Sequence, residues 1–151
     1  IDEKEGTDTM EEDLKKLYDE GKKAFGFYCG KGEWFLLTLK NIDFMSQMLP
    51  DVSKASQSLD VSVLHTLILE KIFGIDKENM AKQINLTYTK FFTEAIDGVD
   101  KGEFQCSFVL NPTRVTEIRD VAAAGEKMPQ KSTYFYPKMI TGMVMNNLGV
   151  D

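Results

Sequence analysis

Residues 24–39 read AFGFYCGKGEWFLLTL, and this stretch decides the fold because it predicts a β-hairpin. Two runs of aromatic and aliphatic residues, about 24–29 and 33–39, flank a Gly-Lys-Gly turn at residues 30–32. Such runs on either side of a glycine-rich turn are typical of paired antiparallel strands. The hairpin therefore predicts that the domain is built around a sheet.

The segments on either side of the hairpin carry helical patterns. Residues 9–20 predict a helix that begins with Thr9 as the N-cap of a capping box. Residues 60–73 predict a buried helix, because apolar residues wrap most of its circumference. Asp60 is its expected N-cap, and Gly74 stands where a C-terminal glycine belongs.

The rest of the chain alternates between helical and strand patterns. Residues 111–125 predict a helix capped by Asn111 or Thr113. Its expected buried face consists of Val115, Ile118, Val121 and Ala122. The other predicted elements are a partly helical connection at 40–60, helices near 77–82 and 91–103, and strands at 84–90, 104–110 and 139–146.

This order of elements predicts a single α+β (mixed α/β) domain over residues 9–151. We expect a mixed, mostly antiparallel sheet of about five strands, packed by about four helices. Residues 1–8, IDEKEGTD, predict a disordered leader or the boundary of a longer protein. At 151 residues, the chain is long enough to bury a substantial core.

The net charge of −6 is concentrated at the N-terminus. Residues 1–20 hold nine acidic residues and three lysines, so the charges of the remaining chain balance to zero. Direct nucleic-acid binding needs many cations that face phosphates, and a neutral body argues against it. We find no signal peptide and no run of roughly 18–20 apolar residues. We therefore expect a cytoplasmic protein without membrane contact.

The two cysteines, Cys29 and Cys106, lie in apolar, strand-like runs, and we interpret them as buried free thiols. A disulfide between them requires that the two strands be neighbours, and a reducing compartment disfavours it. With one histidine and no paired-cysteine spacing, the sequence predicts no metal site.

The usual catalytic motifs are missing, because the sequence has no GxGxxG, Walker, GxSxG or HExxH pattern. The only histidine, His65, falls within the 60–73 helix, between its apolar and polar faces. A local structural role is one interpretation of His65, and a functional role requires a partner from elsewhere in the fold. We predict no catalytic residue in this chain.

The charge pattern near the C-terminus is more informative. From Lys127 to Val150 there is no acidic residue, while Lys127, Lys131 and Lys138 supply three positive charges. Hydroxyl groups accompany them at Ser132, Thr133, Tyr134 and Tyr136. Lysines and hydroxyls in an irregular segment suit a phosphate-like anion, and a helix start at 111–113 offers a second set of anion-binding groups. The alternative is a structural loop, made rigid by its two prolines and anchored by its aromatic residues.

The same C-terminal stretch carries a family resemblance. The segments that carry it are LDVSVLHTLILEKIFGI (59–75), FVLNPT (108–113), VAAAGEKMPQKS (121–132) and MPQKSTYFYPKMITGMV (128–144). They resemble the C-terminal part of a bacterial and archaeal family catalogued as domain of unknown function "ten-fifteen". Its members are often labelled SpoOJ/ParA/ParB/RepB-like. The resemblance runs through most of residues 14–148.

The resemblance implies that this chain is the C-terminal domain of a longer protein. The family's N-terminal half looks ParB-like and carries an Asp-Gly-His-His-Arg motif, which is not found in this sequence. ParB-like folds of that kind bind nucleotides, so a nucleotide bound jointly by the two halves is the implied cofactor. The residues that would contribute to a joint site are Lys131, Ser132, Thr133, Tyr134, Tyr136 and Lys138, followed by His65 and Asn111.

Three functions stay open at this point. The domain could complete a phosphate- or nucleotide-type ligand site with the N-terminal half, in a protein that is a nucleotide-dependent enzyme. It could instead be a dimerisation or partner-docking module of a partition-type DNA-binding protein, which predicts an exposed apolar patch near Trp34–Phe35 or Met139–Met145. The third is a purely structural cap. In each case we expect this chain to have no catalytic activity alone.

Overall fold

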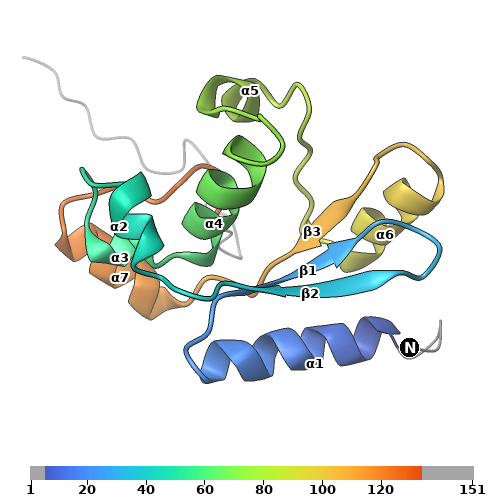
Figure 1. The fold of residues 1–151 in the computed structure, drawn as a ribbon, viewed down its shortest axis with the longest axis horizontal. Helices are drawn as coiled ribbons and strands as arrows, with labels where there is room; N and C mark the ends of the chain where they lie inside the picture. Colours follow the sequence, from blue (N-terminus) through green and yellow to red (C-terminus); the bar gives the residue numbers. More distant parts are fainter. Residues whose placement is uncertain (1–5, 134–151) are drawn as a thin grey trace, which may run out of the picture.

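The computed structural model describes residues 6–133, with side chains from Thr9 onward (Figure 1). This part of the chain is an α+β domain, as predicted, with seven α-helices, one π-helical segment and three strands. The strands are β1 (Ala24–Tyr28), β2 (Trp34–Thr38) and β3 (Ser107–Val109). The helices are α1 (Gly6–Asp19), α2 (Phe44–Met48), α3 (Lys54–Gln57), α4 (Asp60–Val63), α5 (Lys77–Lys82), α6 (Phe92–Asp100) and α7 (Val115–Ala123), and the π-helical segment η1 (Leu64–Glu70) continues α4.

The sheet has the order β2-β1-β3 and is antiparallel throughout. The predicted hairpin is confirmed, with Ala24 paired to Thr38 at one end and Tyr28 to Trp34 at the other. The chain reverses through Gly30, Lys31 and Gly32, all at positive φ. Two glycines meet this requirement without steric cost, so the Gly-Lys-Gly sequence suits the turn.

The described sheet is smaller than the five strands we predicted. Residues 84–90 form no strand and instead run as an irregular connection from α5 to α6. Leu86 packs against the core around Phe25. The rings of Tyr88 and His65 lie edge to face, with their centroids 6.3 Å apart. Leu86 and Tyr88 therefore find contacts without pairing to a strand, whereas Ile84 is 65% exposed. The predicted strand at 139–146 lies outside the described residues.

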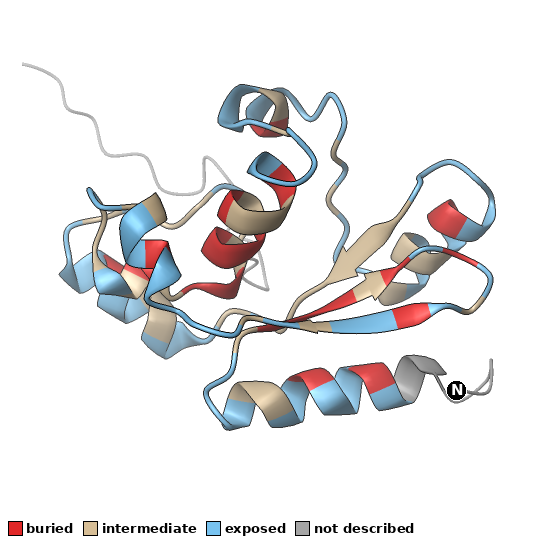
Figure 2. Cartoon of the chain, viewed as in Figure 1, coloured by how far each residue is buried: buried red, intermediate tan, exposed pale blue. Residues whose placement is uncertain are grey.

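The two faces of the sheet bury different clusters (Figures 1 and 2). On the α1 face, Met10 and Leu14 of α1 pack with Ala24, Tyr28 and Trp34 of the hairpin, and α6 adds Val99. On the η1 face, Phe25 packs with residues of α2, α4, η1 and α5. These residues are Met45, Val63, Leu64, Leu69 and Met80.

The helix ends differ from several of our predictions. α1 begins at Gly6, so Thr9 lies inside the helix rather than at its N-cap. The N-cap of α4 is Leu59 and not Asp60, which is the first helical residue. The chain then widens into η1, and Gly74 at φ 69° follows its last turn, as expected.

The helix that we predicted over residues 111–125 is shorter at its start. Its N-cap is Arg114, whose backbone N–H donates to the Glu117 carboxylate at 2.9 Å, so neither Asn111 nor Thr113 is the cap. Val121 is buried and Ile118 half-buried, but Val115 is 74% exposed. Ala122 is exposed as well. Because the helix starts at Val115, this residue stands at the open first turn instead of against the core.

Candidate functional site

The first part of the lysine-rich segment lies against the residues that precede α7. Thr113 Oγ1 donates a 2.9 Å hydrogen bond to the backbone carbonyl of Ser132. The Ser132 hydroxyl donates to the Pro129 carbonyl at 2.6 Å, so its proton is used inside its own turn. Lys131, in the same turn, adopts φ 61°. Two regions that the sequence marked for anion binding therefore touch.

The lysines of this segment are open to solvent. Lys127 and Lys131 are both exposed, and neither forms an ion pair with another residue in the range 6–133. Thr133 is half-buried. Tyr134, Tyr136 and Lys138 lie outside the described residues. Three consecutive residues of the predicted site, Lys131, Ser132 and Thr133, therefore lie within or directly after one hydrogen-bonded turn.

Glu126, just before the segment, is held by α3. Its carboxylate accepts hydrogen bonds from the Ser53 N–H at 2.6 Å, from the Ser53 hydroxyl at 2.8 Å and from the Ser56 hydroxyl. The hydrogen bond from Ser56, and then those from Ser53, lower the pKa of Glu126. This acid is therefore directed toward α3, and the start of the segment is fixed in place.

The remaining predicted residues, His65 and Asn111, have no hydrogen bond or ring contact with the part of this segment up to Thr133. His65 is half-buried in η1, and its described partner is the Tyr88 ring; burial lowers its pKa. Asn111 Nδ2 donates to the Leu14 carbonyl at 3.0 Å, which ties the end of the β3 region to α1. Asn111 thus has a structural contact of its own.

A buried ionic cluster, which the sequence did not indicate, joins the residue before β1 to α4 and α7. Lys23 Nζ lies 2.9 Å from Asp60 Oδ1 and 3.8 Å from Glu117 Oε1. Burial raises the pKa of Asp60, although Lys23 opposes the shift. Both Asp60 oxygens are buried without a well-directed hydrogen-bond donor among the described residues.

One aromatic side chain, Tyr18, and one basic side chain, Arg114, lie next to this cluster. The Arg114 guanidinium lies 4.1 Å from the centre of the Tyr18 ring and pairs with Asp19. Burial and the Glu117 carboxylate raise the pKa of Tyr18. A perturbed buried carboxyl group marks a candidate for proton transfer. Each charge here has a partner within the fold, however, and these contacts fasten three helices together.

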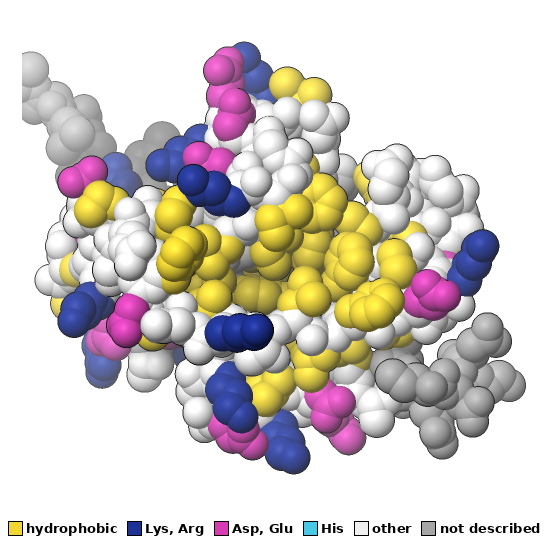
Figure 3. Space-filling model, viewed as in Figure 1, with side chains coloured by type: hydrophobic (Ala, Val, Ile, Leu, Met, Phe, Trp, Pro, Cys, Tyr) yellow, Lys and Arg dark blue, Asp and Glu magenta, His cyan; other side chains and the backbone are white. Residues whose placement is uncertain are grey.

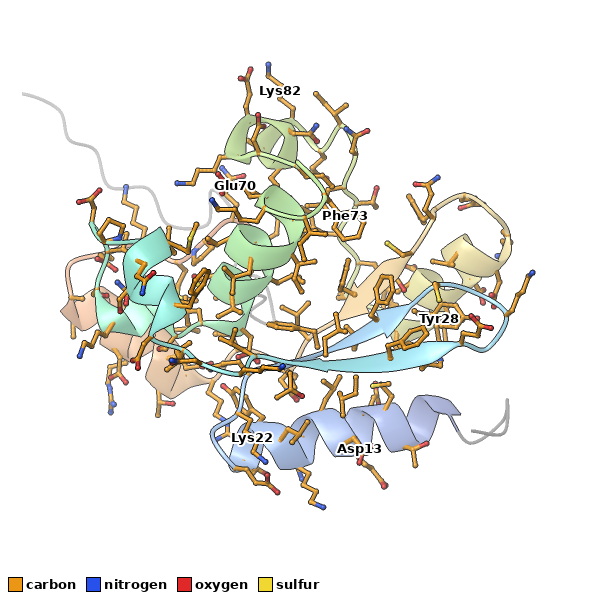
Figure 4. All side chains as sticks on the ribbon, viewed as in Figure 1. Asp13, Lys22, Tyr28, Glu70, Phe73 and Lys82 are labelled. Carbon is orange, nitrogen blue, oxygen red and sulfur yellow. The ribbon has the colours of Figure 1, made fainter. Side chains whose placement is uncertain are left out.

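The η1 face of the sheet carries a row of phenylalanines, Phe27, Phe35, Phe73 and Phe108, here called the aromatic face; Figure 4 labels Phe73. Phe27 lies between Phe35 and Phe108, with ring centroids 6.2 Å and 5.0 Å apart, and Phe73 meets Phe108 at 5.9 Å. Phe35 is 51% exposed and Phe73 48% exposed. Figure 3 shows hydrophobic side chains gathered across the centre of this view. Trp34, in contrast, is buried on the α1 face, so the patch predicted near Trp34–Phe35 rests on Phe35 alone of the two.

Two surface depressions lie among the described residues, away from the predicted ligand site. One lies along α1 beside Glu12, Lys16 and Asp19, and another lies between α2 and α3. Neither includes a residue of the predicted ligand site. Within residues 6–133, no group of three His, Cys, Asp or Glu side chains is placed to hold a metal ion, and no helix is long and apolar enough to cross a membrane.

Comparison of the chain with protein-family models, with curated proteins and with solved structures finds no match. The family resemblance and the functions it implies therefore rest on the sequence segments quoted above. The geometry of the described residues is the independent source of argument about function.

Proposed function

We propose that this chain is a docking domain without catalytic machinery, whose aromatic face receives a second protein domain. The observation that carries this proposal is the row of Phe27, Phe35, Phe73 and Phe108, in which Phe35 and Phe73 are exposed and the other two rings are half-buried. Large aromatic side chains contribute most of the binding free energy in protein interfaces, and contiguous exposed apolar surface marks such interfaces.

The partner we propose is a ParB-like N-terminal half of the kind that the family resemblance implies. A domain that normally packs on another part of the same protein needs an apolar contact surface at the junction. An aromatic row on a sheet meets that need, because the sheet holds the rings in fixed positions. A second copy of this chain is the competing occupant, and a structural cap would leave the rings without any partner.

Hydrogen exchange locates such an interface without mutation. The chain would be measured alone and after mixing with a ParB-like N-terminal half that carries the Asp-Gly-His-His-Arg motif. Docking on the aromatic face predicts slower amide exchange in β2 and around Phe73, with unchanged exchange in residues 84–91. Unchanged exchange in β2 despite binding would place the partner elsewhere and contradict the proposal.

A second candidate function is a contribution to a phosphate or nucleotide site. The contact between Thr113 and Ser132 favours it, because this contact brings the lysine-rich segment to the residues before α7. Lys131 would act as a point charge toward a phosphate, and Lys138 belongs to the same acid-free stretch. The N-terminal half would supply the rest of the site.

The second candidate is tested by titrating ATP and inorganic phosphate into the complex of the two halves. Lys131→Ala and Lys138→Ala should each weaken binding by about tenfold, which corresponds to the loss of one charge-assisted contact. Lys71→Ala, an exposed lysine after η1, is the matched control. Equal affinities for all three variants would exclude the lysine-rich segment as the phosphate site.

A further inference from the structure

Cys29 directly follows β1 and Cys106 directly precedes β3, and these two strands are neighbours in the sheet. The register of β1 and β3 pairs Phe27 with Phe108 and Tyr28 with Ser107. Continued by one residue, this register places Cys29 opposite Cys106. Residues opposite each other in an antiparallel pair project from the same face, so both thiols belong to the face that carries Phe27 and Phe108.

The hydrogen bonds of Cys29 define the kind of pair it forms with Cys106. The Cys29 N–H donates to the Glu33 carbonyl at 3.4 Å, so this donor is directed toward β2 and not toward β3. On the continued register, Cys29 and Cys106 would form a non-hydrogen-bonded pair, the kind in which Cα atoms approach to about 4.5 Å. Disulfide partners usually have Cα atoms about 4.4–6.8 Å apart, so this position admits a disulfide.

Access and proximity both suit oxidation. Cys29 is exposed and Cys106 is half-buried, and both thiols are free. Our interpretation of two buried thiols was wrong, because Cys29 is exposed beside the turn of the hairpin and Cys106 is only half-buried. Burial, and after it the neighbouring Cys29, raise the pKa of Cys106, as expected for two thiols close together. Cys29 Sγ lies 3.7 Å from the Glu33 carbonyl oxygen, so disulfide formation requires this thiol to leave that contact.

We propose that Cys29 and Cys106 form a reversible disulfide across β1 and β3 by exchange with a low-molecular-weight disulfide. The Cys29 thiolate attacks one sulfur of the reagent, which gives a mixed disulfide and releases one small thiolate. Cys106 then loses its proton and attacks Cys29 Sγ, which expels the second small thiolate. Two protein thiols are oxidised by two electrons, and the reagent is reduced to two thiols.

The bond would join the end of the hairpin to the start of β3. It would close a loop of the chain that contains α2 to α6, so the unfolded chain would lose conformational freedom. The inference is independent of docking, because it rests on strand register and not on the exposed rings. It identifies a redox modification site at the end of the sheet.

The test uses the reduced, folded chain and oxidised glutathione. The expected product is a monomer that has lost two hydrogen atoms, with a cross-linked peptide pair containing residues 29 and 106. Its melting temperature should exceed that of the reduced chain by about 5 °C or more, and dithiothreitol should reverse the change.

Cys29→Ser and Cys106→Ser are the matched controls. Cys29→Ser and Cys106→Ser chains should form no internal bond, and Cys106→Ser should retain one glutathione on Cys29. The proposal is overturned if the wild-type chain stops at one or two bound glutathiones, or if it links only to other chains. Peptide mapping of the wild-type protein decides the question even if a serine variant does not fold.

Discussion

The Lys23 ammonium lies 2.9 Å from Asp60 Oδ1, with only 15% and 8% of the two side chains exposed. This contact joins the residue that precedes β1 to the first residue of α4. Removing one member of a buried pair leaves an uncompensated charge, which costs more than the pair itself contributes. Lys23→Met should therefore lower the free energy of unfolding by about 3 kcal/mol at neutral pH.

The effect of Lys23→Met should depend on pH in a defined direction. Burial makes the pKa of Asp60 higher in the folded chain than in the unfolded one. The protonated form therefore favours folding, and this contribution is lost as the pH rises through the folded pKa. Urea unfolding should show that Lys23→Met lowers the free energy of unfolding strongly at pH 7 and much less at pH 4. Glu117 faces the same lysine, so the Lys23→Met/Asp60→Asn double variant separates the two carboxyl groups. If Lys23→Met lowered the free energy of unfolding equally at both pH values, the charge of Asp60 would not be the cause of the destabilisation.

The hydroxyl of Tyr28, as well as its ring, should stabilise the folded chain. The hydroxyl donates to Asp100 Oδ1 at 2.6 Å and accepts from the Gly32 N–H at 3.1 Å. Tyr28→Phe keeps the ring against Trp34 but leaves the turn N–H without this acceptor. The free energy of unfolding should fall by about 1–2 kcal/mol.

Tyr88→Phe is the control for Tyr28→Phe, since Tyr88 is half-buried in the connection before α6 and contacts His65 through its ring. Its urea unfolding midpoint should stay close to that of the wild-type chain. If both variants lost the same free energy of unfolding, the hydroxyl contacts at the hairpin turn would make no specific contribution to stability.

Glu126→Gln tests the attachment of the lysine-rich segment to α3. Hydrogen bonds lower the pKa of Glu126, so its stabilising contribution is present above the usual carboxyl pKa and is lost as the pH falls through the lowered value. The variant should melt at a lower temperature than the wild-type chain at pH 7, and the two should converge in acid. The Ser53 amide should exchange faster in the variant at pH 7.

The control for Glu126→Gln is Glu11→Gln, at an exposed position of α1. This variant should follow the wild-type melting curve throughout the pH range. If Glu126→Gln also followed it at pH 7, the three hydrogen bonds from Ser53 and Ser56 would not contribute to stability.

The sequence pattern correctly predicted those helices and strands that are determined by residues close together in the sequence. The hairpin at 24–39 follows from its two apolar runs and from glycines at positive φ, and the short helix at 77–82 was also predicted. Residues 84–90 show the limit of such patterns. Alternation of Leu86 and Tyr88 is compatible with a strand, but core and ring contacts satisfy both residues in an irregular connection.

Contacts between distant parts of the chain could not be predicted from the pattern. Nothing in the sequence indicates that Lys23 pairs with Asp60 or that Glu126 binds Ser53, because each pair is assembled by the packing of separate helices. The aromatic face was foreseen only at Phe35, since the position of Phe73 depends on how η1 packs over the sheet. The hydrogen bond from Thr113 to the Ser132 carbonyl likewise depends on how the lysine-rich segment packs against the residues before α7.

The most direct test of the docking proposal is the dissociation constant of this chain for the ParB-like N-terminal half. Phe35→Ser and Phe73→Ser remove exposed rings of the aromatic face, whereas Phe91→Ser removes a ring of similar exposure, 53%, outside it. The proposal predicts that each of the first two variants weakens binding by about 30-fold or more, while Phe91→Ser binds like the wild-type chain. Equal dissociation constants for all three variants, or no binding by the wild-type chain, would contradict it.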